Sequence, residues 1–258
     1  MKVEILRRRI GEEKSYWESF SYEPASEQET VISLLDHLNA REDLRNSQGE
    51  PSLPIRFEKS CLQKKCGACA MIVNGAPVLA CQAKLFTGKK KKKPLELIRL
   101  EPLRKFPVVE DLIVNREVLF QNLREIGAWL EGEGLSEEVS RKKLQQDNEA
   151  RYEASRCLQC GICLEVCPNW SVDTAFAGMA AAIPLSRLLY AEGKTAERKR
   201  LSREYRERVY EGCGKSLACQ QVCPAEIPID FLIARSAGIA VWSGLLSKNI
   251  NIFPMGFR

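Results

Sequence analysis

The sequence predicts an α+β protein of two domains, in which a mixed β and α domain precedes an all-helical one. A chain of 258 residues is long enough for two domains of ordinary size. Strand patterns are confined to residues 1–100, whereas from Asp111 onward apolar residues recur three and four positions apart without β alternation. We place the boundary after residue 105, which gives domains at 1–105 and 106–258.

The first domain is expected to combine a small sheet with one helix. Residues 2–9 and 16–22 have the pattern of paired strands, and Thr30 can cap a helix whose apolar residues share one face. His37 lies on this helix, and we expect it to face solvent. The remaining expected elements are a hairpin of 71–73 and 78–80 around an Asn74-Gly75 turn, and a last strand at 95–100.

Helices are expected in the second domain at 111–129, 138–152 and 194–208. The last of these alternates Glu with Arg and carries Leu201, Tyr205 and Val209 at helical spacing. It is therefore expected to be exposed and to rest one narrow face on the core. The apolar segment 231–246 fits two alternatives, a helix that docks against a partner or membrane subunit and a core helix of the domain.

Charge and hydropathy argue against two classes of interaction. The net charge of +5 is mild, and neither basic stretch, 89–93 or 194–208, carries the interleaved aromatics that stack on nucleic acid. The run 89–93 lies between Gly88 and Pro94, as expected of a solvated loop. The best apolar segment of the chain, 236–246, is far shorter than the roughly 20 residues that span a bilayer. We expect no nucleic-acid partner and no transmembrane segment.

The eleven cysteines are the main candidates for chemistry, and they form three groups with none left over. A disulfide framework is not expected, because the count is odd and residues 1–14 are charged, without the apolar region of a secretory signal. A reducing compartment and metal ligation are expected instead. The groups are Cys61, Cys66, Cys69 and Cys81, then Cys157, Cys160, Cys163 and Cys167, then Cys213, Cys219 and Cys223.

The spacings within these groups are those of iron-sulfur proteins. The first group reads CxxxxCxxC with a later fourth Cys, as in plant-type 2Fe-2S ferredoxins, and the second reads CxxCxxCxxxCP, as in bacterial ones. Zinc remains the alternative, because paired CxxC groups also make tetrahedral thiolate sites. The one His in the chain, His37, excludes a Rieske centre, which needs two.

The second and third groups are expected to exchange one ligand. In two-cluster ferredoxins the Cys before Pro binds the other cluster. This rule assigns Cys157, Cys160, Cys163 and Cys223 to a 4Fe-4S cluster. The third group has Ser216 where a second Cys belongs, so Cys167, Cys213 and Cys219 remain and suit a 3Fe-4S cluster. The alternative is a 4Fe-4S cluster with Ser216 as an alkoxide ligand, which is a harder donor than thiolate.

With these residues in view, the chain resembles the iron-sulfur subunits of succinate dehydrogenase and fumarate reductase over nearly its whole length. The resemblance rests on the loop 60–81, the Glu101-Pro102-Leu103 and Phe106-Pro107 linker leading to Asp111-Leu112, and both CP runs. It implies a β-grasp 2Fe-2S domain and a helical domain that holds 4Fe-4S and 3Fe-4S clusters. The chain itself would carry electrons and contain no catalytic residue.

The same resemblance implies the partners. One is a flavoprotein subunit whose FAD interconverts succinate and fumarate. The other is a membrane anchor of one or more subunits, in some cases haem-containing, that binds quinone beside the 3Fe-4S cluster. The complex would lie at the cytoplasmic face of the cell membrane, with this chain peripheral. The implied surroundings of the 3Fe-4S cluster and quinone are Pro168, Trp170, Gly214 and Ser216.

Three residues depart from the family pattern. Lys64 stands where members often have Gly, which raises the question whether the first loop takes a different turn. Val172 replaces a Trp and Gly214 a His of many ubiquinone-linked members, so menaquinone is the expected quinone. Trp170 is a candidate substitute for the missing Trp, although a core or interface position fits it better.

Two other functions remain open: an electron-transfer subunit of another flavoprotein complex, such as a thiol-linked fumarate reductase or a heterodisulfide-type enzyme, and a zinc-stabilised interaction module.

Overall fold

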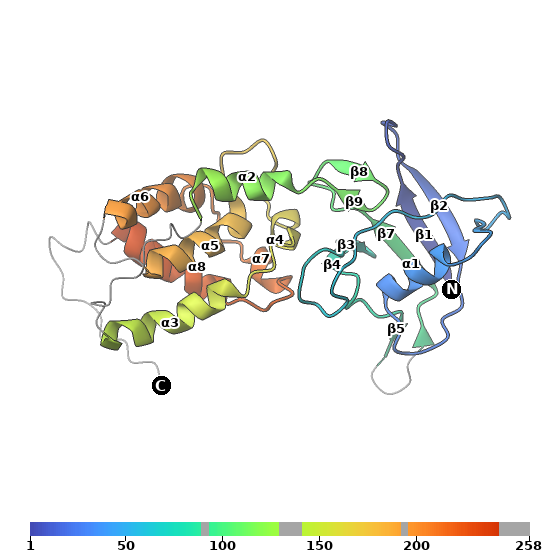
Figure 1. Ribbon diagram of the computed structural model, residues 1–258, viewed down its shortest axis with the longest axis horizontal. Helices are drawn as coiled ribbons and strands as arrows, with labels where there is room; N and C mark the ends of the chain where they lie inside the picture. The colour runs from blue at the N-terminus through green and yellow to red at the C-terminus, as the bar shows by residue number, and fades with distance from the viewer. Residues whose placement is uncertain (89–92, 129–140, 192–195, 243–258) are drawn as a thin grey trace.

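The structure is a computed structural model that describes residues 1–88, 93–128, 141–191 and 196–242. Figure 1 shows a sheet-containing lobe and a helical lobe side by side along the long axis. The N-terminus lies in the sheet lobe, and the chain passes into the helical lobe through the segment labelled β8, β9 and α2.

The first lobe is built on a five-stranded mixed sheet of order β2-β1-β7-β3-β4. Its β1 and β7 are parallel, and the other neighbours are antiparallel. The two strands expected at the start of the chain, the Asn74-Gly75 hairpin and the last strand are all present. The bounds are β1 Lys2–Arg7, β2 Tyr16–Ser21, β3 Ala70–Val73, β4 Ala76–Leu79 and β7 Leu97–Glu101.

One helix, α1 (Val31–Asn39), packs its apolar face on this sheet. Thr30 caps it as expected: the Thr30 N–H donates to Ser33 Oγ (2.8 Å), and Thr30 Oγ1 accepts from the Ser33 N–H (3.4 Å). His37 is exposed, as predicted, and its Nδ1 lies 2.5 Å from the Tyr22 hydroxyl oxygen. The shared core is formed by Val3, Ile5, Phe20, Leu34, Leu35, Leu38, Ile98 and Leu100.

The helix predicted at 111–129 is wrong at its start. Two short strands, β8 (Val108–Glu110) and β9 (Ile113–Val114), form a hairpin there, and α2 begins only at Glu117 (α2, Glu117–Glu125). Asp111 lies in the turn with φ 46°. Its carboxylate is fully buried and lies 2.9 Å from Arg7 Nε, and it accepts hydrogen bonds from the backbone N–H groups of Arg8 and Arg56. These long-range contacts override the local helical spacing.

A second two-stranded sheet, β5 (Phe86–Thr87) and β6 (Lys93–Pro94), flanks the lysine run. Residues 89–92 of that run lie outside the described residues. The predicted helix at 138–152 is described only from Arg141, where α3 (Arg141–Ser155) begins.

The second lobe packs around α5 (Gly178–Ala191), which contacts α2, α3, α4, α6 and α8. On the basic helix, Leu201, Tyr205 and Val209 are buried, as predicted. The expected segment 231–246 is helical through Trp242 and lies outside the described residues from 243. The other bounds are α4 Ile162–Glu165, α6 Ala196–Tyr205, the π-helix η1 Arg206–Tyr210, α7 Ala218–Gln221, α8 Ile229–Ala237 and the π-helix η2 Gly238–Trp242.

The last helical segment shows features of both alternatives considered for it. Leu232, Ser236 and Ala237 are buried against the lobe, whereas Phe231 and Trp242 are exposed. Within the described part of the chain, no helix is both long enough and apolar enough to cross a membrane.

Candidate iron-sulfur sites

The first cysteine group lies on irregular backbone before β3 and in the turn that follows β4. Cys61 Sγ accepts hydrogen bonds from the backbone N–H groups of Gln63 (3.4 Å) and Lys65 (3.3 Å). These donors lower the pKa of the Cys61 thiol to about 7, since they stabilise the thiolate. Hydrogen bonds of this kind would also stabilise negative charge on a cluster.

The β3–β4 hairpin delivers the fourth cysteine of this group. The Ala80 N–H donates to the Cys69 carbonyl (3.0 Å), so Cys81 follows directly from that contact. Burial raises the pKa of Cys69 to about 11, and nearby charge on Cys81 and Cys66 adds to the increase. Cys66 and Cys81 therefore both lie within electrostatic reach of Cys69.

Lys64 adopts a left-handed backbone conformation, with φ 61°, and Leu62 does so with φ 55°. Glycine reaches this region without a steric penalty, whereas other residues do so at a cost. The loop thus makes at Lys64 a turn that glycine would favour, despite the substitution.

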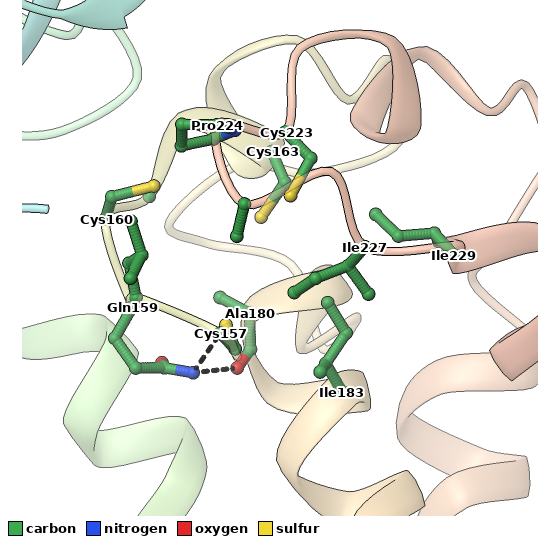
Figure 2. Close-up of a pocket in the computed structure, with 13 residues that line it drawn as sticks. Cys157, Gln159, Cys160, Cys163, Ala180, Ile183, Cys223, Pro224, Ile227 and Ile229 are labelled. Carbon is green, nitrogen blue, oxygen red and sulfur yellow. Dashed lines mark hydrogen bonds between the residues drawn. The ribbon is translucent and has the colours of Figure 1, made fainter. Parts of the chain in front are cut away.

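Four cysteines of the second and third groups line one apolar pocket: Cys157, Cys160, Cys163 and Cys223. In Figure 2, Cys163 and Cys223 lie together at the top of the pocket, Cys160 lies at its left and Cys157 at the bottom. Gln159 Nε2 donates to Cys157 Sγ (3.1 Å) and to the Ala180 carbonyl (2.9 Å), which holds the Cys157 thiol in place. Cys223 reaches this pocket from the segment after α7.

Three of these thiols have a pKa above the usual value. Burial raises the pKa of Cys157 to about 11, and burial also raises the pKa values of Cys160 and Cys163. Near neutral pH such thiols stay protonated unless a cation compensates the negative charge. The pocket lining contains no charged side chain. The donor set therefore fits a cationic iron core, which binds thiolates and displaces their protons.

The remaining three cysteines line a separate pocket: Cys167, Cys213 and Cys219. Burial raises the pKa of Cys219 to about 11, and nearby charge on Cys167 and Cys213 adds to the increase. Ser216 also lines this pocket, between Lys215 and Leu217, which both have φ 57°. The set fits a cluster with three thiolate ligands.

Besides Ser216, two of the four residues expected around the third group line this pocket: Pro168 and Gly214. Gly214 packs so closely on Asn169 that an added Cβ would lie 2.9 Å from the Asn169 side-chain nitrogen. Trp170 does not line the pocket. It is buried, with its ring centroid 5.2 Å from that of Phe106, in agreement with a core position.

We call the pocket of the second cysteine group the second pocket and that of Cys213 and Cys219 the third pocket. Cys163 lies within electrostatic reach of Cys219 as well as of the other cysteines of the second pocket. The second and third pockets are thus neighbours. Within the described residues, no three His, Cys, Asp or Glu side chains are grouped tightly enough to hold a single metal ion. The ligands of a cluster bind different iron atoms and need not converge on one point.

Sequence reasoning missed three polar residues at these sites. Gln159 could have been found from its place inside the CxxC motif. Lys105 lies in the linker, and its Nζ donates to the Cys167 carbonyl and to the Trp170 carbonyl (3.0 Å). Arg116 lies at the start of α2 and donates to the Ala68 carbonyl (2.9 Å). Nothing in their local sequence signals these contacts.

Known proteins resemble the chain over both lobes. Residues 2–121 match the family model of a 2Fe-2S iron-sulfur cluster binding domain, and residues 153–227 match that of a 4Fe-4S dicluster domain. The chain is 33% identical over 235 residues to the succinate dehydrogenase iron-sulfur subunit of Bacillus subtilis, a match that covers 89% of this chain and 88% of that one.

The chain belongs to the family of succinate dehydrogenase and fumarate reductase iron-sulfur subunits. As a family member it is a subunit of an oxidoreductase, with a 2Fe-2S domain followed by a 4Fe-4S-type domain. The fumarate reductase iron-sulfur subunit of Haemophilus influenzae is 29% identical, over 88% of each chain.

A longer relative and a solved structure complete the comparison. A subunit of the CoM/CoB fumarate reductase of Methanothermobacter marburgensis is 29% identical over 89% of this chain, which spans only 42% of that protein. A chain of the Mycobacterium smegmatis Sdh1 complex in the apo form aligns with TM-score 0.68 and 21% identity, covering 92% of this chain and 95% of that one. At that identity the likeness shows a shared fold.

Proposed function

We propose that this chain is the electron-transfer subunit of a succinate:quinone oxidoreductase or quinol:fumarate reductase. It relays electrons between the FAD of a flavoprotein subunit and a quinone at the membrane. The observation that carries the proposal is the adjacency of the three cysteine groups. The first loop contacts the second pocket, and the second pocket neighbours the third. Bound clusters supply one-electron transfer, and the chain's residues hold, bury and charge-balance them.

These groupings support three ligand sets. Within the proposal, Cys61, Cys66, Cys69 and Cys81 hold a 2Fe-2S cluster, and Cys157, Cys160, Cys163 and Cys223 hold a 4Fe-4S cluster. Cys167, Cys213 and Cys219 hold a 3Fe-4S cluster beside Ser216. The buried thiols with raised pKa and the uncharged second pocket support these assignments.

The finer description of the domains belongs to the same proposal. A mixed sheet with parallel central strands β1 and β7 and one packed helix supports a β-grasp assignment for the first domain. We retain 105/106 as the sequence-based boundary, although the β8–β9 hairpin beyond it stays attached to the first lobe through Asp111.

The two ends of the relay determine the partners. We propose a flavoprotein at the end of the first group and a membrane anchor at the end of the third, where Pro168, Gly214 and Ser216 would lie near a quinone. Menaquinone is the proposed quinone, because Gly214 and Val172 replace residues of many ubiquinone-linked members. The complex would lie at the cytoplasmic face of the cell membrane. Trp170, which is buried, is not part of the proposed quinone site.

The test is isolation of the complex from its native host under anaerobic conditions, followed by an assay with succinate and a quinone analogue. We expect a copurifying flavoprotein, succinate-dependent dye reduction and about nine iron atoms per chain, the sum for the three cluster types. A colourless protein that contains zinc would contradict the proposal. So would an iron-sulfur protein whose partner does not oxidise succinate.

The second candidate is an electron-transfer subunit of a thiol-linked fumarate reductase. The likeness to the Methanothermobacter protein favours it, although this chain spans less than half of that protein. The two functions separate in one experiment. Fumarate reduction driven by thiol cofactors but not by a quinol would favour the second, and the reverse pattern the first.

A further inference from the structure

The loop of the first cysteine group touches the second group at a glycine. Gly67, between Cys66 and Ala68, is buried and has φ 77°. A Cβ at this position would lie 2.8 Å from Cys160 Cβ and 2.9 Å from the Leu158 carbonyl oxygen. These neighbours are a ligand's own Cβ and a backbone atom, so neither can move aside as a flexible side-chain end can. The absence of a side chain at Gly67 therefore sets how closely the two groups approach.

Arg116 binds the loop of the first cysteine group next to Gly67. Its Nη2 donates to the carbonyl of Ala68 (2.9 Å) and lies 3.1 Å from Glu58 Oε2. The charge of Arg116 also lies within electrostatic reach of Cys160 on the other side of the contact. Its side chain is only 15% exposed, so solvent screens this charge weakly.

One nitrogen of the Arg116 guanidinium, Nε, is buried without a hydrogen-bond partner among the described residues. A buried guanidinium N–H without a partner, beside two cysteine groups, could donate to the sulfur atoms of a bound cluster. Such a hydrogen bond stabilises the negative charge that the cluster gains when it is reduced.

We propose that Gly67 and Arg116 form the crossing point between the first and second clusters, that is, the contact through which electrons pass from one cluster to the other. This inference rests on the proposed function. With clusters bound at Cys66 and Cys69 and at Cys160, one electron would leave the first site, which would be oxidised, and enter the second, which would be reduced. No bond breaks and no proton moves. Gly67 keeps the two sites close, and Arg116 is a positioning residue that fixes the loop and stabilises the added negative charge.

The first experiment changes the distance. In Gly67→Ala the loop must move away from Cys160, so the magnetic interaction between the two reduced clusters weakens, because dipolar coupling falls with the cube of the distance. EPR of the complex, fully reduced with dithionite or a photoreduced flavin, measures it. Electron transfer between the two sites should also slow in freeze-quench EPR.

Gly75→Ala is the matched control for Gly67→Ala. Gly75 has a similar φ of 80° but nothing within 4 Å of an added Cβ, so it carries the same backbone strain without the contact. Equal spectra for the two variants and wild type, with both clusters present, would overturn the role of Gly67.

The second experiment changes the charge and covers the case in which Gly67→Ala does not fold. Arg116→Met should lower the midpoint potential of the second cluster, and Arg116→Lys should restore part of it. Arg99→Met controls for net charge, because Arg99 is 56% exposed and pairs with Glu4 on the sheet. Potentials that stay unchanged in Arg116→Met would overturn the role of Arg116.

The iron content and EPR signals of the wild-type complex separate this inference from the proposed function. If the wild type lacks either signal, the proposed function fails and the crossing point fails with it. If both signals are present and neither Gly67→Ala nor Arg116→Met changes coupling, rate or potential, the crossing point alone is overturned.

Discussion

Ser216 occupies the position in the third cysteine group that Cys160 occupies in the second. It is exposed and lines the third pocket together with Cys167, Cys213 and Cys219. Ser216→Cys adds a fourth thiol to that set. We expect one more iron atom per chain and loss of the 3Fe-4S EPR signal of the oxidised protein, because a 4Fe-4S cluster replaces it. Iron analysis and EPR of the same sample measure both changes.

Ser216→Ala distinguishes the two ligand sets at this site. If three thiolates hold the cluster, removal of the hydroxyl leaves the iron content and the oxidised EPR signal unchanged. Loss of one iron atom in Ser216→Ala would show that the serine alkoxide is a ligand, contrary to the expected 3Fe-4S cluster.

Cys61 and Cys69 are predicted to differ sharply in reactivity when no cluster is bound. Backbone N–H donors hold the pKa of Cys61 at about 7, and burial raises the pKa of Cys69 to about 11. Because a thiolate forms above its pKa and is the reactive species, alkylation of Cys61 should rise through pH 7 while Cys69 stays slow. Iodoacetamide labelling of the cluster-free chain, read by peptide mass spectrometry, measures the two rates. Equal rates in the folded chain would contradict this prediction, whereas unfolding should equalise them.

Among the elements, the β8–β9 hairpin depends on one buried ion pair. Arg7 and Asp111 are both fully buried, and Arg7 Nη1 also lies 2.7 Å from Glu18 Oε2. Asp111→Ala leaves the guanidinium with less compensation and two backbone N–H groups without their acceptor. We expect a loss of about 3–5 kcal/mol in the free energy of unfolding, as for broken buried pairs. Urea unfolding of the chain measures it.

Asp43→Ala is the control for Asp111→Ala, because Asp43 pairs with Arg45 in solvent, with side chains 64% and 51% exposed. Its loss should cost no more than about 1 kcal/mol. A similar, small effect of both substitutions would contradict the importance assigned to the hairpin contact.

The sequence predicted those elements whose signals are local. The strand pair β1–β2, the capped helix α1, the Asn74-Gly75 hairpin and the buried face of α6 each depend on neighbouring residues, and all are present. The β8–β9 hairpin was missed because the partner of Asp111 is Arg7, at the far end of the domain. The apolar residues after Asp111 are spaced three and four apart, as in a helix. The segment forms a turn instead because Asp111 pairs with the distant Arg7.

At the scale of the whole molecule, the two lobes should respond differently to cluster removal. In the first lobe, α1 and the sheet bury apolar side chains such as Leu34 and Ile98 between them. The cysteine-rich part of the second rests on the four-residue helices α4 and α7 and irregular backbone. Without clusters these segments lose their cross-links. We expect faster hydrogen exchange in α4 and α7 and little change in β1 and β7, measured by mass spectrometry. Unchanged protection of α4 and α7 would contradict this.

Cys223 lines the same pocket as Cys157, Cys160 and Cys163, and Cys167 lines that of Cys213 and Cys219, while the role of all these residues as ligands stays a prediction. The sequence could not name Arg116 or Lys105, because these reach the sites through backbone carbonyls of distant segments. The positions of Arg116 and Lys105 are set by tertiary packing, and no local pattern encodes them.

The buried pair of Arg7 and Asp111 also limits how the protein can be divided. A fragment cut at residue 105 would keep the guanidinium, Glu18 and the Leu53 and Pro54 carbonyls that accept from Arg7 Nη2, but would lose Asp111. Its β1 strand would then carry a poorly balanced buried charge next to the core. A free-standing ferredoxin piece made from this chain should therefore extend at least through β9, and truncation at the sequence boundary would give a poorly folding product.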